Sequence, residues 1–196
     1  MNFNDAHELW SIFRVSVCNQ LEHTSTERFR NVWHNDRART AFYTGDLFPR
    51  IASDLKFETF CELFRVDMAM GLLSPAGLIP LVWVESENNS NSASQEVKKL
   101  ACLSGPLKVL ITCDEWDETP GAWRHGGRKT RLLQSWTTIL QSHSQLLPTQ
   151  SLFAILVGEW NNSRSTLRFY GTTLDATGKR IEDDSILMER DIGARN

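Results

Sequence analysis

Three segments in the middle of the chain carry the apolar patterns of β-strands, at residues 64–71, 81–87 and 107–112. The third is an almost continuous apolar run, which is typical of a strand buried on both faces of a sheet. Residues 71–80 contain two prolines and two glycines. This connection is too short for a helical crossover, so the first two strands should be antiparallel. A predicted helix between residues 92 and 106 separates the second strand from the third, so those two should be parallel, with a right-handed connection.

Periodic patterns on either side of these strands predict one α/β domain over residues 1–196 with a mixed central sheet flanked by helices. The helix after the third strand has the clearest apolar stripe, and it should pack on the sheet before a fourth inner strand joins. The last predicted strand is expected at an edge, and the charged tail after it is expected to be flexible. The further helices are predicted at residues 5–22, 24–37, 45–56 and 130–147, the first two within an N-terminal helical segment 1–44; the further strands are predicted at 57–61, 151–157 and 167–173, and the tail at 182–196.

The composition is that of an ordinary soluble protein, with 41% hydrophobic and 23% charged residues among 196. A net charge of −3 excludes a generally basic surface for nonspecific nucleic-acid binding, although it permits a local basic groove. The four cysteines have no CxxC spacing and are expected to be reduced thiols. The sequence contains no apolar run of the ~18 residues that a membrane span requires. We therefore expect a cytoplasmic protein with no membrane partner.

Acidic residues interrupt the first two strands, where apolar residues would be expected. Glu85 and Glu87 share one face of their strand with Leu81 and Trp83, and their side chains would stand roughly 7 Å apart. Asp67 on the neighbouring strand would bring a third carboxylate close to them. Three such carboxylates repel one another unless a cation or a proton intervenes, and oxygen ligands suit Mg²⁺, Mn²⁺ or Ca²⁺. The alternative is that Glu85 and Glu87 leave the edge of the sheet and are solvated, and the residue pattern does not decide between the two.

The predicted order of helix, three strands, helix and strand resembles the restriction-endonuclease-like αβββαβ core of the PD-(D/E)XK nuclease superfamily. The aspartate of that family comes on the second core strand, where Asp67 fits, and its (D/E)-x-K motif comes on the third, where Glu85-Ser86-Glu87 stands. Residues 84–88, 96–100 and 106–112 look more narrowly like a poorly characterised group of such proteins that is rich in Glu-x-Glu-Asn. The resemblance covers about residues 45 to 160.

One departure from the family concerns the lysine of its motif, because Glu87 stands in that place. Some restriction endonucleases of this fold also carry Glu-x-Glu and remain active. Lys98 or Lys99, on the following helix, would supply the missing cation, whereas the alternative is a solvated lysine on the surface of that helix.

The resemblance also implies roles for individual residues in a metal-dependent reaction. Asp67, Glu85 and the carbonyl of Ser86 would hold Mg²⁺ or Mn²⁺. Glu87 would orient or deprotonate the attacking water or hold a second metal. Glu62 is an accessory candidate, but it is expected opposite Asp67 on a regular strand and needs a bulge or turn to reach the site.

A basic loop follows the strand predicted at residues 107–112 and would receive phosphates near a helix start. A simple flexible loop is the alternative. Three tryptophans would stack on bases, or else belong to the core or its rim. The loop residues are Arg124, His125, Arg128 and Lys129, with Arg131 close by, and the tryptophans are Trp123, Trp136 and Trp160.

The sequence leaves three hypotheses open. The first is a metal-dependent nuclease-like hydrolase that cleaves DNA phosphodiester bonds. The second is a non-catalytic module of the same fold that binds a protein or a nucleic acid. The third is an α/β interaction protein unrelated to nucleases. The oligomeric state does not follow from the sequence.

Overall fold

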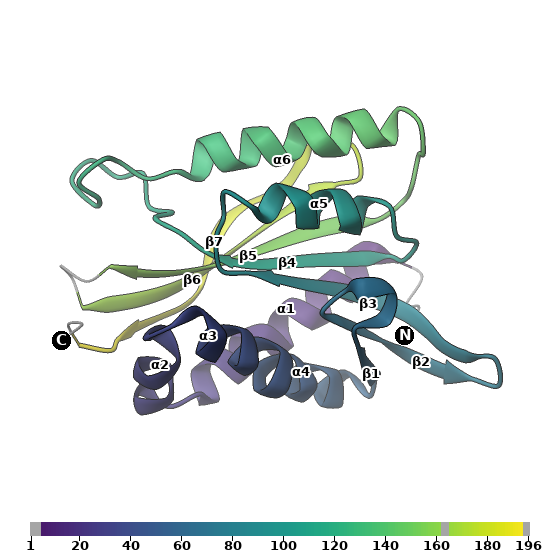
Figure 1. The fold of residues 1–196 in the computed structure, drawn as a ribbon, viewed down its shortest axis with the longest axis horizontal. Helices are drawn as coiled ribbons and strands as arrows, with labels where there is room; N and C mark the ends of the chain where they lie inside the picture. Colours follow the sequence, from purple (N-terminus) through teal and green to yellow (C-terminus); the bar gives the residue numbers. More distant parts are fainter. Residues whose placement is uncertain (1–4, 162–164, 194–196) are drawn as a thin grey trace.

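The computed structural model, which describes residues 5–161 and 165–193, is an α/β fold around one mixed sheet of seven strands (Figure 1). The strands lie in the sheet in their chain order, so each pairs with its neighbours in sequence. Strands β3, β4 and β5 are parallel to one another, and the other pairs are antiparallel. The strands are β1 (Glu58–Cys61), β2 (Met68–Ser74), β3 (Gly77–Glu87), β4 (Leu107–Cys113), β5 (Leu152–Asn161), β6 (Thr166–Asp175) and β7 (Arg180–Asp191).

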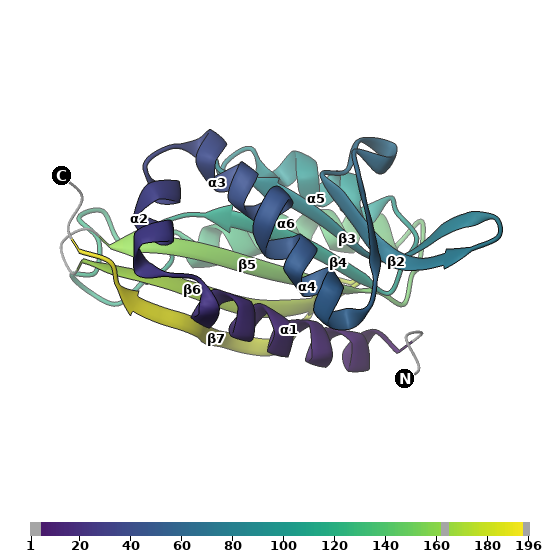
Figure 2. The ribbon, with the colours of Figure 1, turned by 90° about the horizontal axis from the view of Figure 1, so that it is seen from below.

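Helices cover both faces of the sheet (Figures 1 and 2). The four N-terminal helices lie on one face, and the two helices that connect the parallel strands lie on the other. They are α1 (Ala6–His23), α2 (Thr26–Trp33), α3 (Asp36–Phe42), α4 (Phe48–Leu55), α5 (Ala93–Ala101) and α6 (Lys129–Ser144); the π-helical turn Tyr43–Leu47 joins α3 to α4. Among the residues that the structure describes, no helix is long and apolar enough to cross a membrane.

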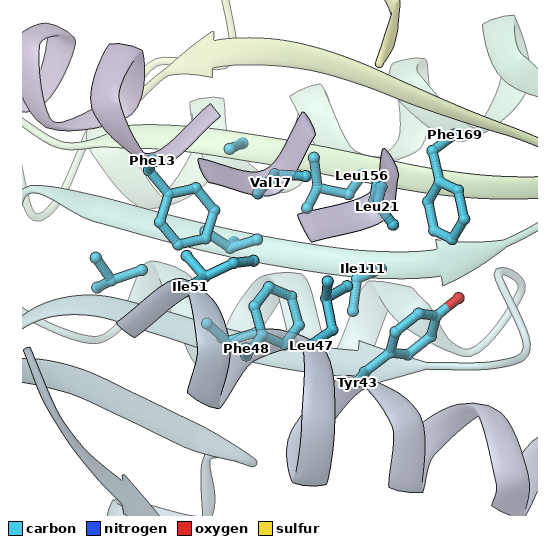
Figure 3. Close-up of a cluster of buried hydrophobic side chains, with 14 of the residues drawn as sticks. Phe13, Val17, Leu21, Tyr43, Leu47, Phe48, Ile51, Ile111, Leu156 and Phe169 are labelled. Atoms are coloured by element: carbon cyan, nitrogen blue, oxygen red, sulfur yellow. The ribbon is translucent and has the colours of Figure 1, made fainter. Parts of the chain in front are cut away.

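Each face of the sheet has its own hydrophobic core. The core under α1–α4 includes Phe13 of α1, Phe48 of α4 and Leu156 of β5, all buried (Figure 3). On the other face, Trp136 of α6 stacks on Trp116 with ring centroids 6.4 Å apart. A sheet that is buried on both faces explains the nearly continuous apolar runs of β4 and β5.

The central predictions from the sequence are confirmed. The strands β2 and β3 are antiparallel neighbours, with Met68 opposite Val84, and β3 and β4 are parallel neighbours connected through α5. The β1 strand forms a hairpin with β2, and β5 joins the sheet beside β4 after α6. The order of the inner strands therefore follows from the lengths of their connections.

Other predicted boundaries are wrong. The helix predicted over 24–37 is two helices, because Asn35 is extended and its side chain caps α3 by accepting a hydrogen bond from Ala38 N (2.8 Å). The strand predicted from residue 64 begins only at Met68, because Leu63–Arg65 forms a 3₁₀ turn.

The C-terminal region also differs from its prediction. The strand expected at an edge is β6, which lies between β5 and β7. The tail expected to be flexible from residue 182 instead forms most of β7, the true edge strand, as far as Asp191. Trp10 of α1 donates from Nε1 to Glu182 (2.9 Å), so side chains far apart in sequence hold this charged strand in place.

We expect Phe13→Ala to lower the free energy of unfolding by about 3–5 kcal/mol, because it removes a fully buried ring from the core under α1. Val15→Ala on the same helix is the matched control, since Val15 is 59% exposed and its loss should cost under ~0.5 kcal/mol. Denaturant unfolding of both variants measures the difference. Equal losses in the two variants would contradict the packing of α1 on the sheet.

Candidate functional site

Two carboxylates lie side by side where β2 begins and β3 approaches its end. Asp67 directly precedes β2, and the pairing of Met68 with Val84 places Asp67 across from Glu85. Both fall on the face of the sheet that carries Trp83 and that α5 covers. Asp67 Oδ2 accepts a hydrogen bond from the backbone N–H of Ser86 (2.7 Å), which fixes its carboxylate beside the strand.

A lysine from α5 reaches this pair of acids. Lys99 Nζ lies 2.6 Å from Glu85 Oε1 and 2.5 Å from Glu96 Oε2, and it donates to the carbonyl oxygen of Arg65 (3.0 Å). Glu96 and Lys99 are neighbours on the surface of α5 because they are three residues apart. The lysine therefore connects α5, β3 and the loop that precedes β2.

Burial determines the protonation of the site. Glu85 is only 2% exposed, and its burial is the main cause that raises its pKa from 4.5 to about 8. The negative charges of Asp67 and Glu96 contribute to this rise, and the hydrogen bond and charge of Lys99 oppose it. Burial also raises the pKa of Asp67, against the lowering effect of the hydrogen bond from Ser86. Partial burial lowers the pKa of Lys99, but its ion pairs with Glu85 and Glu96 outweigh that effect and raise it. The cluster of Asp67, Glu85, Glu96 and Lys99 therefore contains more acidic than basic groups.

A second buried acid in the same sheet shows what a fully satisfied carboxylate looks like. Glu159 of β5 accepts hydrogen bonds from Trp116 N and Asp117 N (both 2.6 Å), from Trp123 Nε1 (3.1 Å) and from the hydroxyl of Tyr170 (3.2 Å). The three donors from Trp116, Asp117 and Trp123 hold the loop after β4 on the sheet, which is a structural role. Glu85 has Lys99 as its one partner among the residues that the structure describes.

The structure places the other predicted site residues away from a shared centre. Glu87 is at the end of β3, and its Oε1 accepts a hydrogen bond from Asn89 N (2.8 Å) instead of joining Asp67 and Glu85. Glu62 is exposed, and its carboxylate acts on that of Asp67 through its charge. Lys98 is exposed on α5. Within the described residues, no group of three or more His, Cys, Asp and Glu side chains is arranged to hold a metal ion.

Glu96 is not among the residues predicted for the site, and Lys98 and Lys99 are alternatives in that prediction. The phase of the helix would have made that choice: Val97 and Leu100 are two of the four buried positions of α5, and Glu96 and Lys99 each directly precede one of them. An acid and a lysine beside the buried stripe lie at the edge of the sheet-facing side. The phase of α5 therefore favours Lys99 as the lysine of the site.

The basic loop before α6 does not form one cationic patch. Arg128 Nε donates to the buried carboxylate of Asp114 (2.6 Å), and Lys129 Nζ lies 2.9 Å from Asp184 of β7. Arg124 and His125 are exposed, and neither forms an ion pair within residues 5–161 and 165–193. Two of the four predicted phosphate contacts are therefore neutralised by acids from other parts of the fold.

The three tryptophans proposed to stack on bases have different surroundings. Trp136 is fully buried in the core beside α6 and is not accessible to a ligand. Trp123 and Trp160 are half-buried, and with Trp33 they line an open groove of about 380 Å³ at the ends of β4 and β5. Stacking by Trp123 and Trp160 stays a prediction, whereas Trp136 is a core residue.

Comparisons with known proteins do not assign this chain to a family. No protein-family model matches the chain, and no curated protein matches its sequence. The resemblance to PD-(D/E)XK nucleases stays a prediction from the sequence. The function must be inferred from the arrangement of Asp67, Glu85, Glu96 and Lys99.

The raised pKa of Glu85 predicts a pH-dependent stability. Between pH 4.5 and about 8 the unfolded chain releases the proton that folded Glu85 keeps, so this group's contribution to stability is full below pH 4.5 and is lost as the pH rises through about 8. Glu85→Gln removes that loss. We expect the variant to gain at least about 1 kcal/mol of unfolding free energy over the wild type when the pH is raised from about 5 to about 8.

Denaturant unfolding at the two pH values, without divalent metal, measures this gain. Glu87→Gln is the control, because a glutamine still accepts the hydrogen bond from Asn89 and the variant should follow the wild type. Parallel pH profiles for the wild type and Glu85→Gln would show that Glu85 is already ionised in the folded protein.

Proposed function

We propose that this chain is a metal-dependent nuclease-like hydrolase of the PD-(D/E)XK type that cleaves DNA phosphodiester bonds in the cytoplasm. The observation that carries the proposal is the position of Lys99, whose ammonium lies 2.6 Å from the buried carboxylate of Glu85. The family's motif places a lysine beside such a carboxylate. In this chain Glu87 takes the motif position, and the following helix supplies the cation.

The order of elements supports the same proposal. From α4 to β4 the chain runs through a helix, three strands, a helix and a fourth strand, with the first three strands antiparallel and the fourth parallel to the third. That order agrees with the αβββαβ core expected from the sequence. Because one fold hosts many functions, the chemistry of the site carries more weight than this agreement.

The charge balance at the site would favour a divalent cation, although the described His, Cys, Asp and Glu side chains form no group of three arranged around one. Asp67, Glu85 and Glu96 provide three carboxylates around the single ammonium of Lys99, so the fully ionised cluster lacks two positive charges. Hard oxygen ligands of this kind suit Mg²⁺ or Mn²⁺, and Mg²⁺ is commonly bound by one or two carboxylates together with waters and phosphate oxygens. Asp67 and Glu85, with the Ser86 carbonyl, would hold the ion.

The reaction adds water to the phosphorus and breaks one P–O ester bond. A bound divalent cation supplies neutralisation of the phosphate charge and lowers the pKa of a water. The Ser86 N–H holds the carboxylate of Asp67 in place, and Glu96 keeps Lys99 at the site. The ammonium of Lys99 is the group that stabilises the negative charge building on the phosphate oxygens in the transition state.

The second candidate is a non-catalytic module of the same fold that binds a protein or a nucleic acid. The substitution of Glu87 for the motif lysine, together with its hydrogen bond to Asn89, favours this candidate. Both candidates predict a folded chain with Lys99 beside Glu85. They differ in metal binding and in cleavage.

Metal binding should stabilise the folded chain, because a ligand that binds only the folded state shifts the unfolding equilibrium. At about 100 times the dissociation constant, Mn²⁺ should add about 2.7 kcal/mol to the free energy of unfolding. Asp67→Asn should abolish the increase in Tm that wild type shows. Asp183→Asn is the control, because this carboxylate is 94% exposed on β7. A wild-type Tm that does not respond to millimolar Mn²⁺ or Mg²⁺ would count against the metal site.

Cleavage should depend on Lys99 and not on Lys98. We expect Glu85→Gln and Lys99→Met to lower the rate of Mn²⁺-dependent DNA cleavage by at least about 10²-fold, since each removes a charged group from the site. Lys98→Met is the matched control, because its side chain is exposed on the same helix and its activity should stay at the wild-type level. Nicking of plasmid and of labelled oligonucleotides measures the rates, with Tm as the check of folding.

Three results would contradict the assignment. Wild-type rates in Glu85→Gln would place the cleavage elsewhere or in a contaminant. Equal losses in Lys98→Met and Lys99→Met would remove the special role of Lys99. Binding of metal and DNA without any cleavage would favour the non-catalytic candidate.

A further inference from the structure

The loop between β1 and β2, residues 62–67, is held in an unusual backbone conformation beside the proposed site. Glu62, Phe64 and Arg65 have positive φ angles of 57°, 53° and 62°. Residues with side chains rarely adopt this left-handed region, and each instance typically costs about 1–3 kcal/mol. The loop is closed at its base by a hydrogen bond from Glu62 N to the carbonyl of Asp67 (3.4 Å). The fold therefore maintains this conformation against its local cost.

The conformation presents an aromatic ring to solvent. Phe64 is 72% exposed, the most of any phenylalanine among the described residues. Its ring centroid lies 6.2 Å from that of Trp83, at an interplanar angle of 51°. Trp83 is itself buried and is fixed by a hydrogen bond from its Nε1 to the carbonyl of Ser104 (2.7 Å). The exposed ring thus rests on a rigid support.

That support belongs to the strand of the proposed site. Trp83 precedes Glu85 by two residues on the same face of β3, a separation of roughly 7 Å along the strand. The next residue of the loop, Arg65, accepts the hydrogen bond from Lys99 Nζ through its carbonyl oxygen. Phe64 and the site are therefore held in one local arrangement by two independent contacts.

The surface around Phe64 is suited to a phosphate backbone. Arg65 is exposed, and within the part of the chain that the structure describes its guanidinium forms no ion pair. An exposed aromatic ring next to an accessible cation is the combination by which proteins bind single-stranded nucleic acids, with stacked bases and contacted phosphates.

We propose that Phe64 is a stacking platform for an unpaired base of single-stranded DNA and that Arg65 binds the adjoining phosphate. This inference rests on the proposed nuclease function and specifies its substrate as a strand with unpaired bases next to the scissile bond. In a continuous duplex the faces of the bases are covered by their neighbours, so a side chain that stacks on one face selects single strands, flaps or frayed ends.

The test measures binding of a fluorescent oligothymidylate of about 12 nucleotides in EDTA, where cleavage is suppressed, with a duplex of the same length as competitor. Phe64→Ala and Phe64→Gly should each weaken binding of the single strand by about 5- to 100-fold and leave binding of the duplex unchanged. Glycine suits the left-handed backbone, so its variant removes the ring without added strain. Phe64→Trp should restore the affinity to near the wild-type value.

Arg65→Ala should reduce the slope of log affinity against log salt by about 0.7, the value of one phosphate contact on a single strand. Ile186→Ala is the control for the loss of an exposed apolar side chain, since Ile186 is 54% exposed on the edge strand β7. It should bind like the wild type.

The outcomes separate this inference from the proposed function. If the wild type cleaves DNA in a Lys99-dependent manner and Phe64→Ala binds the single strand as tightly as the wild type, the stacking role is wrong and the nuclease proposal stands. If the wild type neither binds nor cleaves any DNA, both are wrong. If Phe64→Ala alters only the oligomeric state, the ring serves a contact between copies of the chain and the stacking role is also wrong.

Discussion

A carboxylate that is buried away from water needs hydrogen-bond donors or positive charges in place of the water molecules. When these are incomplete, burying the charged group costs several kcal/mol of folding free energy. Two glutamates of this sheet meet that requirement in different ways. Glu159 is surrounded by four hydrogen-bond donors, and its role is to hold the loop after β4. Glu85 is equally buried but has Lys99 as its one partner in the described chain, with Asp67 and Glu96 adding negative charge beside it. Such incomplete compensation favours binding a proton or a cation, and it is the physical basis for treating this part of the sheet as a functional site.

The architecture places the members of this cluster together through the connections of three strands. The β2–β3 hairpin sets Asp67 across from Glu85, and the crossover through α5 returns the chain over the same face, so Lys99 lies above Glu85. The directions of these strands could be predicted from the sequence, because a short connection requires antiparallel strands and a helical crossover requires parallel ones. The edge strand β7 could not be predicted in this way. Its sequence is charged, and its contacts with α1 involve partners more than a hundred residues away, such as Trp10.

The candidate site was predictable in part, for a related reason. Alternation along a strand assigns a side chain to a face, which sufficed for Asp67 and Glu85. It does not say where the strand ends, and Glu87 occupies the last position of β3, where its carboxylate turns to the backbone of Asn89. The basic loop illustrates the same limit. Arg128 and Lys129 appear free in the sequence, but Asp114 and Asp184 reach them from other elements. The sequence shows which basic side chains are present. Only the fold determines which of them remain unpaired and accessible to a ligand.

Unfavourable backbone conformations are concentrated in the loop between β1 and β2, beside the proposed site. Three of the five non-glycine residues with positive φ among the described residues lie at positions 62–65, and they include the most exposed phenylalanine. The same loop contacts Lys99, the partner of the buried Glu85. The helices α1, α2 and α3 begin at the polar caps Asp5, Ser25 and Asn35, and β4 and β5 are mostly apolar on both faces, as local preferences require. A sequence that follows these preferences almost everywhere and violates several of them at one place retains the violations at a cost in stability. The strained loop and the under-compensated carboxylate are therefore best explained together, as two parts of one site whose ligand supplies what the chain itself lacks.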